Sequence, residues 1–155
     1  MIYDVFFTVA LLYPAYVDIR SRNIPVEYVC GLGIVGLLWR ILFYQSAGWG
    51  EIYGICIVLF IFGGQVFFSK GKWLGIGDIY LALALTGILG PRNFLVAIYF
   101  AYVIGGSIAL IAYIFGFVKK GDRVPFAPAL ILGAYIALWF GDGIQSAILS
   151  LYGTY

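Results

Sequence analysis

The chain has 155 residues, of which 64% are hydrophobic and only 10% are charged. Soluble domains carry about 25% charged residues, so the charges here are too few to cover a globule in water. This composition excludes a water-soluble domain and a disordered chain, and a net charge of +2 gives no indication of a nucleic-acid partner. We therefore expect an integral membrane protein in contact with lipid.

Six apolar runs follow one another along the chain, and the breaks between them contain nearly all of the charged residues. A membrane-spanning helix needs roughly 17–25 mainly apolar residues to cross about 30 Å of hydrocarbon. The predicted spans are, in chain order, Val5–Val17, Tyr28–Tyr44, Ile52–Phe68, Ile79–Leu89, Phe94–Val118 and Phe126–Phe140. The sequence thus predicts an all-α, polytopic membrane protein, with about six transmembrane helices packed as a bundle in a single membrane-embedded domain over residues 1–155. The apolar tail Ile144–Tyr152 is too short to span and is expected to lie at an interface.

The basic residues are divided unevenly between the two sides of such a bundle. The loops after the first, third and fifth spans contain Arg20, Arg22, Lys70, Lys72, Lys119, Lys120 and Arg123, and the other side contains Arg40 and Arg92. Cytoplasmic loops of membrane proteins carry an excess of Lys and Arg. We therefore expect the first group of loops in the cytoplasm and both chain termini outside.

Two acidic residues stand where predicted spans meet the side that is rich in basic residues. Asp18 ends the first span and Asp78 opens the fourth, so span parity places both at the cytoplasmic mouth of the bundle. The fourth span is short, because the 11 residues between Asp78 and Gly90 reach roughly 17 Å as a helix. Either the bilayer thins there, or Asp78 is drawn below the headgroups toward a low dielectric.

Two carboxyl groups brought together can share one proton. The ionised carboxylate then activates a water molecule and the protonated one supplies a proton to the leaving group, as in aspartic proteases. The chain has no histidine and only two cysteines, which removes histidine-dependent nucleophiles and the common zinc sites, and aspartate chemistry needs neither a metal nor another cofactor. The alternative is that both aspartates are solvated charges, paired with Arg20, Arg22 or Lys72.

Two further segments at the same mouth have backbones suited to a peptide substrate. In Gly75-Ile76-Gly77-Asp78 the glycines lack a Cβ and let the backbone approach a ligand closely. Pro125 and Pro128 enclose Phe126 at the start of the sixth span. Because proline has no N–H, a carbonyl or amide near it is left to pair with an extended peptide. An ordinary helix start with proline is the alternative for this segment.

Together these segments resemble the type IV prepilin peptidases, the bacterial members of the GxGD aspartyl proteases. The resemblance covers nearly the whole chain and rests on three motifs: Asp18 seven residues before Pro25, then Gly75-Ile76-Gly77-Asp78, then Pro125-Phe126-Ala127-Pro128. It implies that Asp18 and Asp78 are the catalytic residues. The residues expected to shape the site or bind substrate are Gly75, Gly77, Pro125, Phe126 and Pro128.

The same resemblance implies a substrate and a location. Members of this family cut prepilins and related pseudopilins at the cytoplasmic face of the bacterial inner membrane, between a short basic leader and the apolar helix that follows. Larger members also methylate the new N-terminus, using an N-terminal region with a cysteine tetrad; the sequence has neither, and we expect a short form without that methyltransferase region. The sequence departs from the usual family pattern at Val26, at Tyr80 (where lysine is usual) and at Ala127.

Three other functions stay open at this point. Pro128-Ala129-Leu130 also matches the Pro-Ala-Leu motif of presenilins and signal peptide peptidases, which are intramembrane proteases of other substrates. A small proton-coupled transporter would use Asp18 and Asp78 as relay groups, although transporters usually place such groups near the midplane. A structural subunit of a pilus-assembly system would need neither aspartate.

Overall fold

The computed structural model describes residues 2–21, 23–44, 49–71, 74–117 and 125–151. Within these ranges the chain is helical and contains no strand, which confirms the predicted all-α class. The elements are α1 (Ile2–Ser21), α2 (Val26–Tyr44), α3 (Trp49–Val58), the π-helical η1 (Leu59–Gly63), α4 (Gly64–Ser69), α5 (Ile76–Ile114) and α6 (Ala127–Leu151). Among the described residues, five helical stretches are long and apolar enough to cross a membrane: Ile2–Ser21, Val26–Phe43, Trp49–Ser69, Ile76–Ile114 and Ala127–Leu151.

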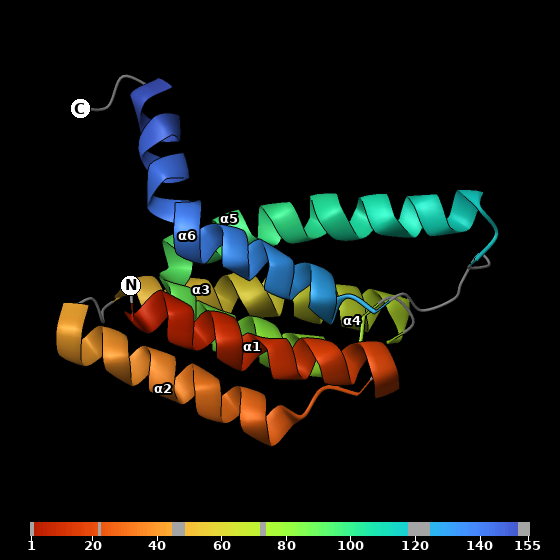
Figure 1. The fold of residues 1–155 in the computed structure, drawn as a ribbon, viewed down its shortest axis with the longest axis horizontal. Coiled ribbons are helices and arrows are strands. Elements are labelled where there is room, and N and C mark those ends of the chain that lie inside the picture. Colours follow the sequence, from red (N-terminus) through yellow and green to blue (C-terminus); the bar gives the residue numbers. More distant parts are fainter. Residues whose placement is uncertain (1, 22, 45–48, 72–73, 118–124, 152–155) are drawn as a thin grey trace.

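Helix α5 contains two of the six predicted spans. At Gly90 the backbone leaves the helical conformation, with φ of 77° and ψ of 162°, and Pro91 follows without an N–H to continue the helical hydrogen bonds. The two halves of α5 fold back at this point and run in opposite directions (Figure 1). They correspond to the predicted fourth and fifth spans, so a count of about six agrees with the structure. The first half begins at Ile76, slightly earlier than predicted, and therefore includes Asp78 in its first turn.

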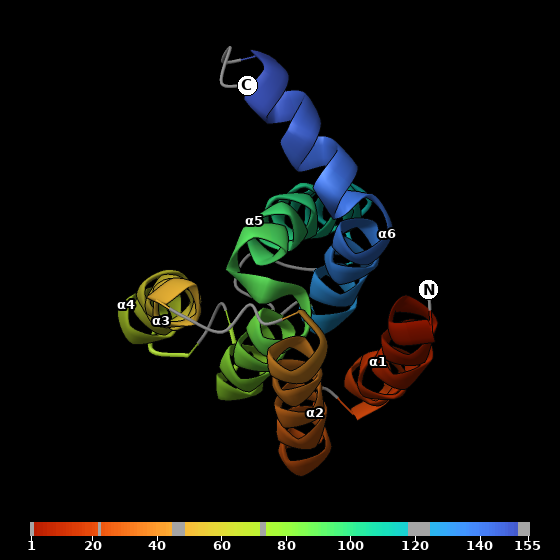
Figure 2. The same ribbon diagram turned by 90° about the vertical axis from the view of Figure 1, so that its left-hand side faces the viewer.

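Small residues let α5 approach its neighbours closely at the centre of the bundle. Figure 2, in which most helices are seen nearly end-on, shows α5 in the middle, with α1 and α6 on one side and α3 and α4 on the other. A Cβ added to Gly33 of α2 would lie 2.7 Å from the Cα of Ala84 in α5, and one added to Gly133 of α6 would lie 2.2 Å from the carbonyl oxygen of Ala97. Such packing is a main source of helix association in lipid, because lipid tails are as apolar as the side chains of the core.

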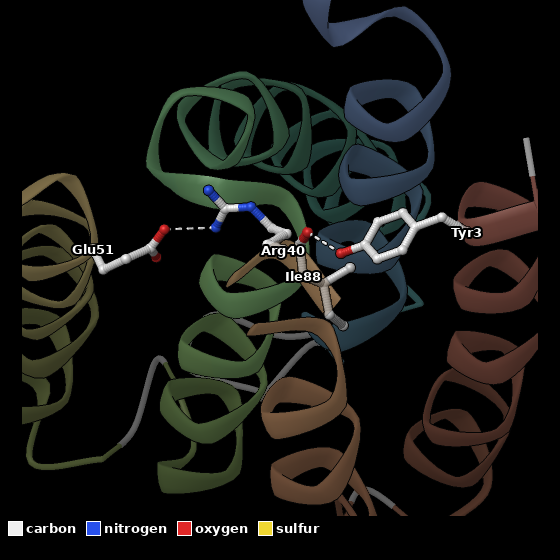
Figure 3. A network of polar contacts seen from close by, with 4 residues as sticks. All are labelled: Tyr3, Arg40, Glu51 and Ile88. Carbon is white, nitrogen blue, oxygen red and sulfur yellow. Dashed lines mark hydrogen bonds and ion pairs between the residues drawn. The ribbon is translucent and has the colours of Figure 1, made fainter. Parts of the chain in front are cut away.

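A cluster of polar contacts surrounds the break in α5. The guanidinium of Arg40, near the end of α2, pairs with the carboxylate of Glu51 in α3 at 2.7 Å. The hydroxyl of Tyr3 in α1 donates to the carbonyl oxygen of Ile88, just before the break (Figure 3). Four elements are therefore joined at this end of the bundle, which we call the arginine end.

The last part of α6 turns away from the direction of the other helices (Figure 1). Helix α6 continues to Leu151, beyond the predicted end of the sixth span at Phe140. Asn93, just after the break in α5, donates to Asp142 at 3.1 Å and accepts a hydrogen bond from Gln145. These contacts attach the start of the turned segment to the arginine end. The interfacial position of this tail stays a prediction, and Tyr152 lies outside the described residues.

Candidate active site

Asp18 lies near the end of α1, on the face of the helix that meets the bundle. The buried residues of α1 recur every three or four positions and are Tyr3, Phe7, Leu11, Pro14 and Asp18. This spacing forms a single stripe along an α-helix. The aspartate that ends the stripe is therefore directed inward, and only 6% of its surface is exposed. Asp18 interacts with other groups of the protein, and its Oδ2 atom is a buried atom that accepts no hydrogen bond among the described residues.

Asp78 lies in the first turn of α5 and is 8% exposed. Gly75, in extended conformation just before the helix, donates its backbone N–H to Oδ2 of Asp78 at 2.9 Å. The N-terminal end of a helix also favours a negative charge, since its first N–H groups have no partner within the helix. The Gly-x-Gly-Asp segment therefore fixes the orientation of its own carboxylate.

Gly77 brings the segment around Asp78 against the segment that follows Asp18. A Cβ added to Gly77 would lie 3.1 Å from the Cβ of Ile24, a contact tighter than side chains normally make. Ile24 is buried and precedes Pro25, whose carbonyl accepts a hydrogen bond from Val29 in the first turn of α2. A glycine is needed here because the two segments approach so closely.

The fold brings the two aspartates to the same end of the bundle, which we call the aspartate end. Asp18 is near the end of α1 and Asp78 opens α5, and the two carboxyl groups are close enough for the charge of Asp18 to act on Asp78, although 59 residues lie between them in the chain. Both side chains are more than nine-tenths buried, which disagrees with the alternative of two solvated surface charges.

Pro125 and Phe126 lie just before α6 at the aspartate end, and Pro128 lies in its first turn. The carbonyl of Phe126 accepts a hydrogen bond from Leu130 at 3.0 Å, as in an ordinary first helical turn. That carbonyl is therefore engaged within the protein, as the helix-start alternative expects. The ring of Phe126 packs against the ring of Tyr102 in α5, with centroids 5.3 Å apart.

Tyr102 and Gln65 belong to the same site but were not singled out by the sequence analysis. The side-chain amide of Gln65 in α4 donates to the Tyr102 hydroxyl, and the charge of Asp78 acts on that hydroxyl. The one signal in the sequence was a polar glutamine inside the predicted third span. Tyr102 gave no signal, since it is one of 13 tyrosines in the chain.

The described residues contain no group of three or more His, Cys, Asp or Glu side chains arranged to hold a metal ion. Cys30 and Cys56 are both free thiols. The described polar side chains that interact around Asp78 are the carboxyl group of Asp18, the phenol of Tyr102 and, bonded to that phenol, the amide of Gln65.

Comparison with known proteins shows the family. The family model described as the type IV leader peptidase family matches residues 5–110. The chain belongs to this family. The matched range includes Asp18 and Asp78 and ends before the segment around Phe126. The family expected from the three sequence motifs is thereby confirmed.

Two curated relatives are similar to the chain. One is a prepilin leader peptidase/N-methyltransferase of Bacillus subtilis, 32% identical over 78 residues, which are 50% of this chain and 32% of that protein. Another is a prepilin leader peptidase/N-methyltransferase of Stutzerimonas stutzeri, 25% identical over 152 residues, which are 92% of this chain and 50% of that protein. The chain thus spans half or less of the length of these relatives. No solved structure matches it significantly.

Proposed function

We propose that this chain is an aspartic endopeptidase that removes the short basic leader from prepilins or pseudopilins, with Asp18 and Asp78 as its catalytic pair. One observation carries the proposal: two carboxyl groups far apart in the sequence are both buried at one end of the bundle, where the charge of one acts on the other. Burying two carboxyl groups together lowers stability, because each ionises at a cost in desolvation and in repulsion from the other. Ionisable residues within membrane-spanning helices usually serve a function. Membership of the type IV leader peptidase family supports the same conclusion.

The proposed reaction is hydrolysis of one peptide bond by a pair that shares one proton. The ionised aspartate removes a proton from water, and the water oxygen adds to the scissile carbonyl carbon. The protonated partner donates its proton as the carbon–nitrogen bond breaks, and the leaving nitrogen departs as an amine. The proton taken from water restores the pair to its starting state. The N–H of Gly75, bound to Oδ2, keeps the Asp78 carboxylate in one orientation through these steps.

The proposed location of cleavage is the boundary between the inner membrane and the cytoplasm. Arg20, near the end of α1, and Lys70, at the end of α4, are both at the aspartate end of the bundle. At the other end are Arg40 and Arg92, so the described basic residues are equal in number at the two ends. The remaining five of the group predicted for the cytoplasmic side lie outside the described residues: Arg22, Lys72, Lys119, Lys120 and Arg123. The support for a cytoplasmic aspartate end is therefore the predicted excess of seven basic residues against two along the sequence. We propose, with this orientation, a single membrane-embedded peptidase domain with its termini on the outer side.

The remaining functional alternatives have less support. A proton-coupled carrier would need its carboxyl groups near the midplane of the membrane, whereas both aspartates lie at one end of the bundle. A structural pilus subunit would have no use for two buried carboxyl groups. A presenilin-like protease would use the same chemistry on other substrates, and the curated relatives are named as prepilin peptidases.

The test is cleavage of a prepilin by the purified chain in liposomes, with Asp18→Asn and Asp78→Asn compared with the wild type. The matched control is Glu27→Gln, which removes an exposed carboxylate in the first turn of α2, at the same end of the bundle. We expect both asparagine variants to lose cleavage while they keep a cooperative thermal unfolding transition, and we expect the control to keep cleavage. Full cleavage by either folded asparagine variant would exclude the catalytic pair.

A further inference from the structure

A tyrosine in the second half of α5 lies at the aspartate end because α5 folds back on itself. Asp78 and Tyr102 are each twelve residues from Gly90, one before it and one after it. At 1.5 Å per residue, two antiparallel helical segments of this length place both residues about 18 Å from the break. The fold thus brings them to the same depth in the bundle, and the charge of Asp78 acts on the Tyr102 hydroxyl.

The ring of Tyr102 is held from two sides by other aromatic rings. Phe62 in η1 is fully buried, and its ring centroid lies 6.3 Å from that of Tyr102. Phe126, before α6, lies 5.3 Å from Tyr102 and 6.1 Å from Phe62. Three elements therefore contribute to one aromatic wall, and this packing leaves the phenol ring little freedom to turn away from the aspartate end.

Gln65 fixes the hydroxyl group itself. Its side-chain amide donates a hydrogen bond to the Tyr102 oxygen, which occupies an acceptor position of the hydroxyl. The hydroxyl hydrogen is then available to an acceptor on another side. A phenol held in this way is a donor of fixed position, which is the property that a site for a developing negative charge requires.

A π-helical turn just before Gln65 determines the face of the helix on which this residue lies. The π-helical turn Leu59–Gly63 lies between α3 and α4 and ends two residues before Gln65. A π-helical turn contains one more residue than an α-helical turn, so it rotates the residues after it by about 100° relative to an unbroken α-helix. Without this turn, Gln65 would be on a different face from the one that meets α5.

We propose that Tyr102 is a further catalytic residue, whose hydroxyl donates a hydrogen bond to the carbonyl oxygen of the scissile peptide, and that Gln65 is its positioning residue. This inference rests on the proposed peptidase function. As water adds to the carbonyl carbon, negative charge develops on the carbonyl oxygen, and a donor already in place stabilises it. The proton stays on Tyr102 throughout, so the acid–base steps remain those of the two aspartates.

The main test is the rate of prepilin cleavage by Tyr102→Phe, which removes the hydroxyl and keeps the ring. We expect kcat to fall by about 10²-fold, the usual effect of losing one such donor, with KM nearly unchanged. The control is Tyr99→Phe, in the same half of α5, because Tyr99 is 65% exposed. A kcat for Tyr102→Phe within twofold of the wild type would overturn the inference.

A second variant distinguishes a positioning role from a structural one. Gln65→Met keeps the length of the side chain and leaves Tyr102 in place, so it tests the inference even where Tyr102→Phe does not fold. We expect a smaller fall in kcat than for Tyr102→Phe, and no further fall when the two changes are combined, since both act through one hydrogen bond. Additive effects of the two changes, or an effect on KM alone, would contradict this assignment.

The outcomes also separate this inference from the proposed function. Suppose that the wild type cleaves, that Asp78→Asn loses cleavage, and that Tyr102→Phe keeps full activity. This combination would support the proposed peptidase function and overturn the role of Tyr102. Failure of the wild-type chain to cleave any prepilin in liposomes would overturn both.

Discussion

The two ends of the bundle differ in which polar groups they bury next to one another. At the arginine end, groups of opposite charge or complementary hydrogen bonding meet: Arg40 pairs with Glu51, and the Tyr3 hydroxyl donates to the Ile88 carbonyl. At the aspartate end, two carboxyl groups are buried within reach of each other's charge. Satisfied polar networks fix a fold, whereas two carboxyl groups buried together oppose it, because burial and mutual repulsion disfavour their ionisation. The arginine end therefore stabilises the bundle, and the aspartate end has the arrangement that the proposed peptidase function requires.

The largest expected effect that tests this comparison is on cleavage by Asp78→Asn. We expect the cleavage rate to fall by about 10³-fold or more, because the variant loses a general acid or base. Thermal stability should stay equal or rise, since the change replaces a buried ionisable group with a neutral amide of the same shape. Cleavage and unfolding are measured on the same liposome preparation, and a marked loss of stability would show that the carboxylate serves the fold.

Arg40→Met should lower stability and leave cleavage unchanged, the opposite of what we expect for Asp78→Asn. The Arg40 and Glu51 side chains are 13% and 16% exposed, so breaking their pair leaves a largely buried carboxylate and should lower stability by about 2–3 kcal/mol. Cleavage per folded molecule should remain near the wild-type value, because the pair is at the far end from the aspartates. Denaturation in mixed micelles measures the first quantity and cleavage at a permissive temperature the second. The double variant Arg40→Met/Glu51→Met should recover part of the stability.

Gly77→Ala tests how far cleavage depends on the close approach of two segments at the aspartate end. The added methyl group would meet Ile24 at 3.1 Å and push the segment after Asp18 away from the start of α5. A displacement of a few tenths of an ångström should reduce cleavage by about tenfold, because catalysis depends strongly on the mutual position of the two carboxyl groups. The matched control is Gly106→Ala, in α5, where nothing lies within 4 Å of an added Cβ. Equal activity of the two variants would contradict the close approach at Gly77.

The smallest effect is expected for Tyr3→Phe at the arginine end. The change removes the hydrogen bond to the Ile88 carbonyl, next to the break in α5, and should lower stability by about 1 kcal/mol. Cleavage should be unaffected at temperatures where the variant is folded. The shift of the thermal midpoint in detergent measures the effect, and an unchanged midpoint would mean that another donor, such as water, replaces the hydroxyl.

Much of the architecture followed from the sequence because polar residues are rare in it. Each charge, proline or loop glycine in so apolar a chain marks a boundary, so the approximate positions of the spans and the family were predicted correctly. The lengths of α5 and α6 were less accurate. A helix can continue past Phe140 without any change in composition, and only the structure shows that Gly90 joins two spans in one folded-back helix.

The partners of the aspartates could not be predicted for a different reason. In a soluble helix the alternation of polar and apolar residues shows which face is buried, but in lipid both faces are apolar and the pattern is lost. Nothing in the sequence separates Tyr102, which faces the site, from Tyr99, which is exposed nearby. The residues of the π-helical turn Leu59–Gly63 are also as apolar as those of the α-helices around it, so the sequence does not reveal the turn. This turn determines the face of the helix on which Gln65 lies.

The fold-back of α5 at Gly90 restricts how this chain can change in length. One residue inserted between Asp78 and Gly90, or between Gly90 and Tyr102, would move one of these side chains by about 1.5 Å along the bundle and turn it by about 100°. Such an insertion leaves hydropathy and span number unaltered, yet it separates the acid from the phenol. Natural variation in length should therefore accumulate in the connections between helices, while the two arms of this hairpin keep equal numbers of residues.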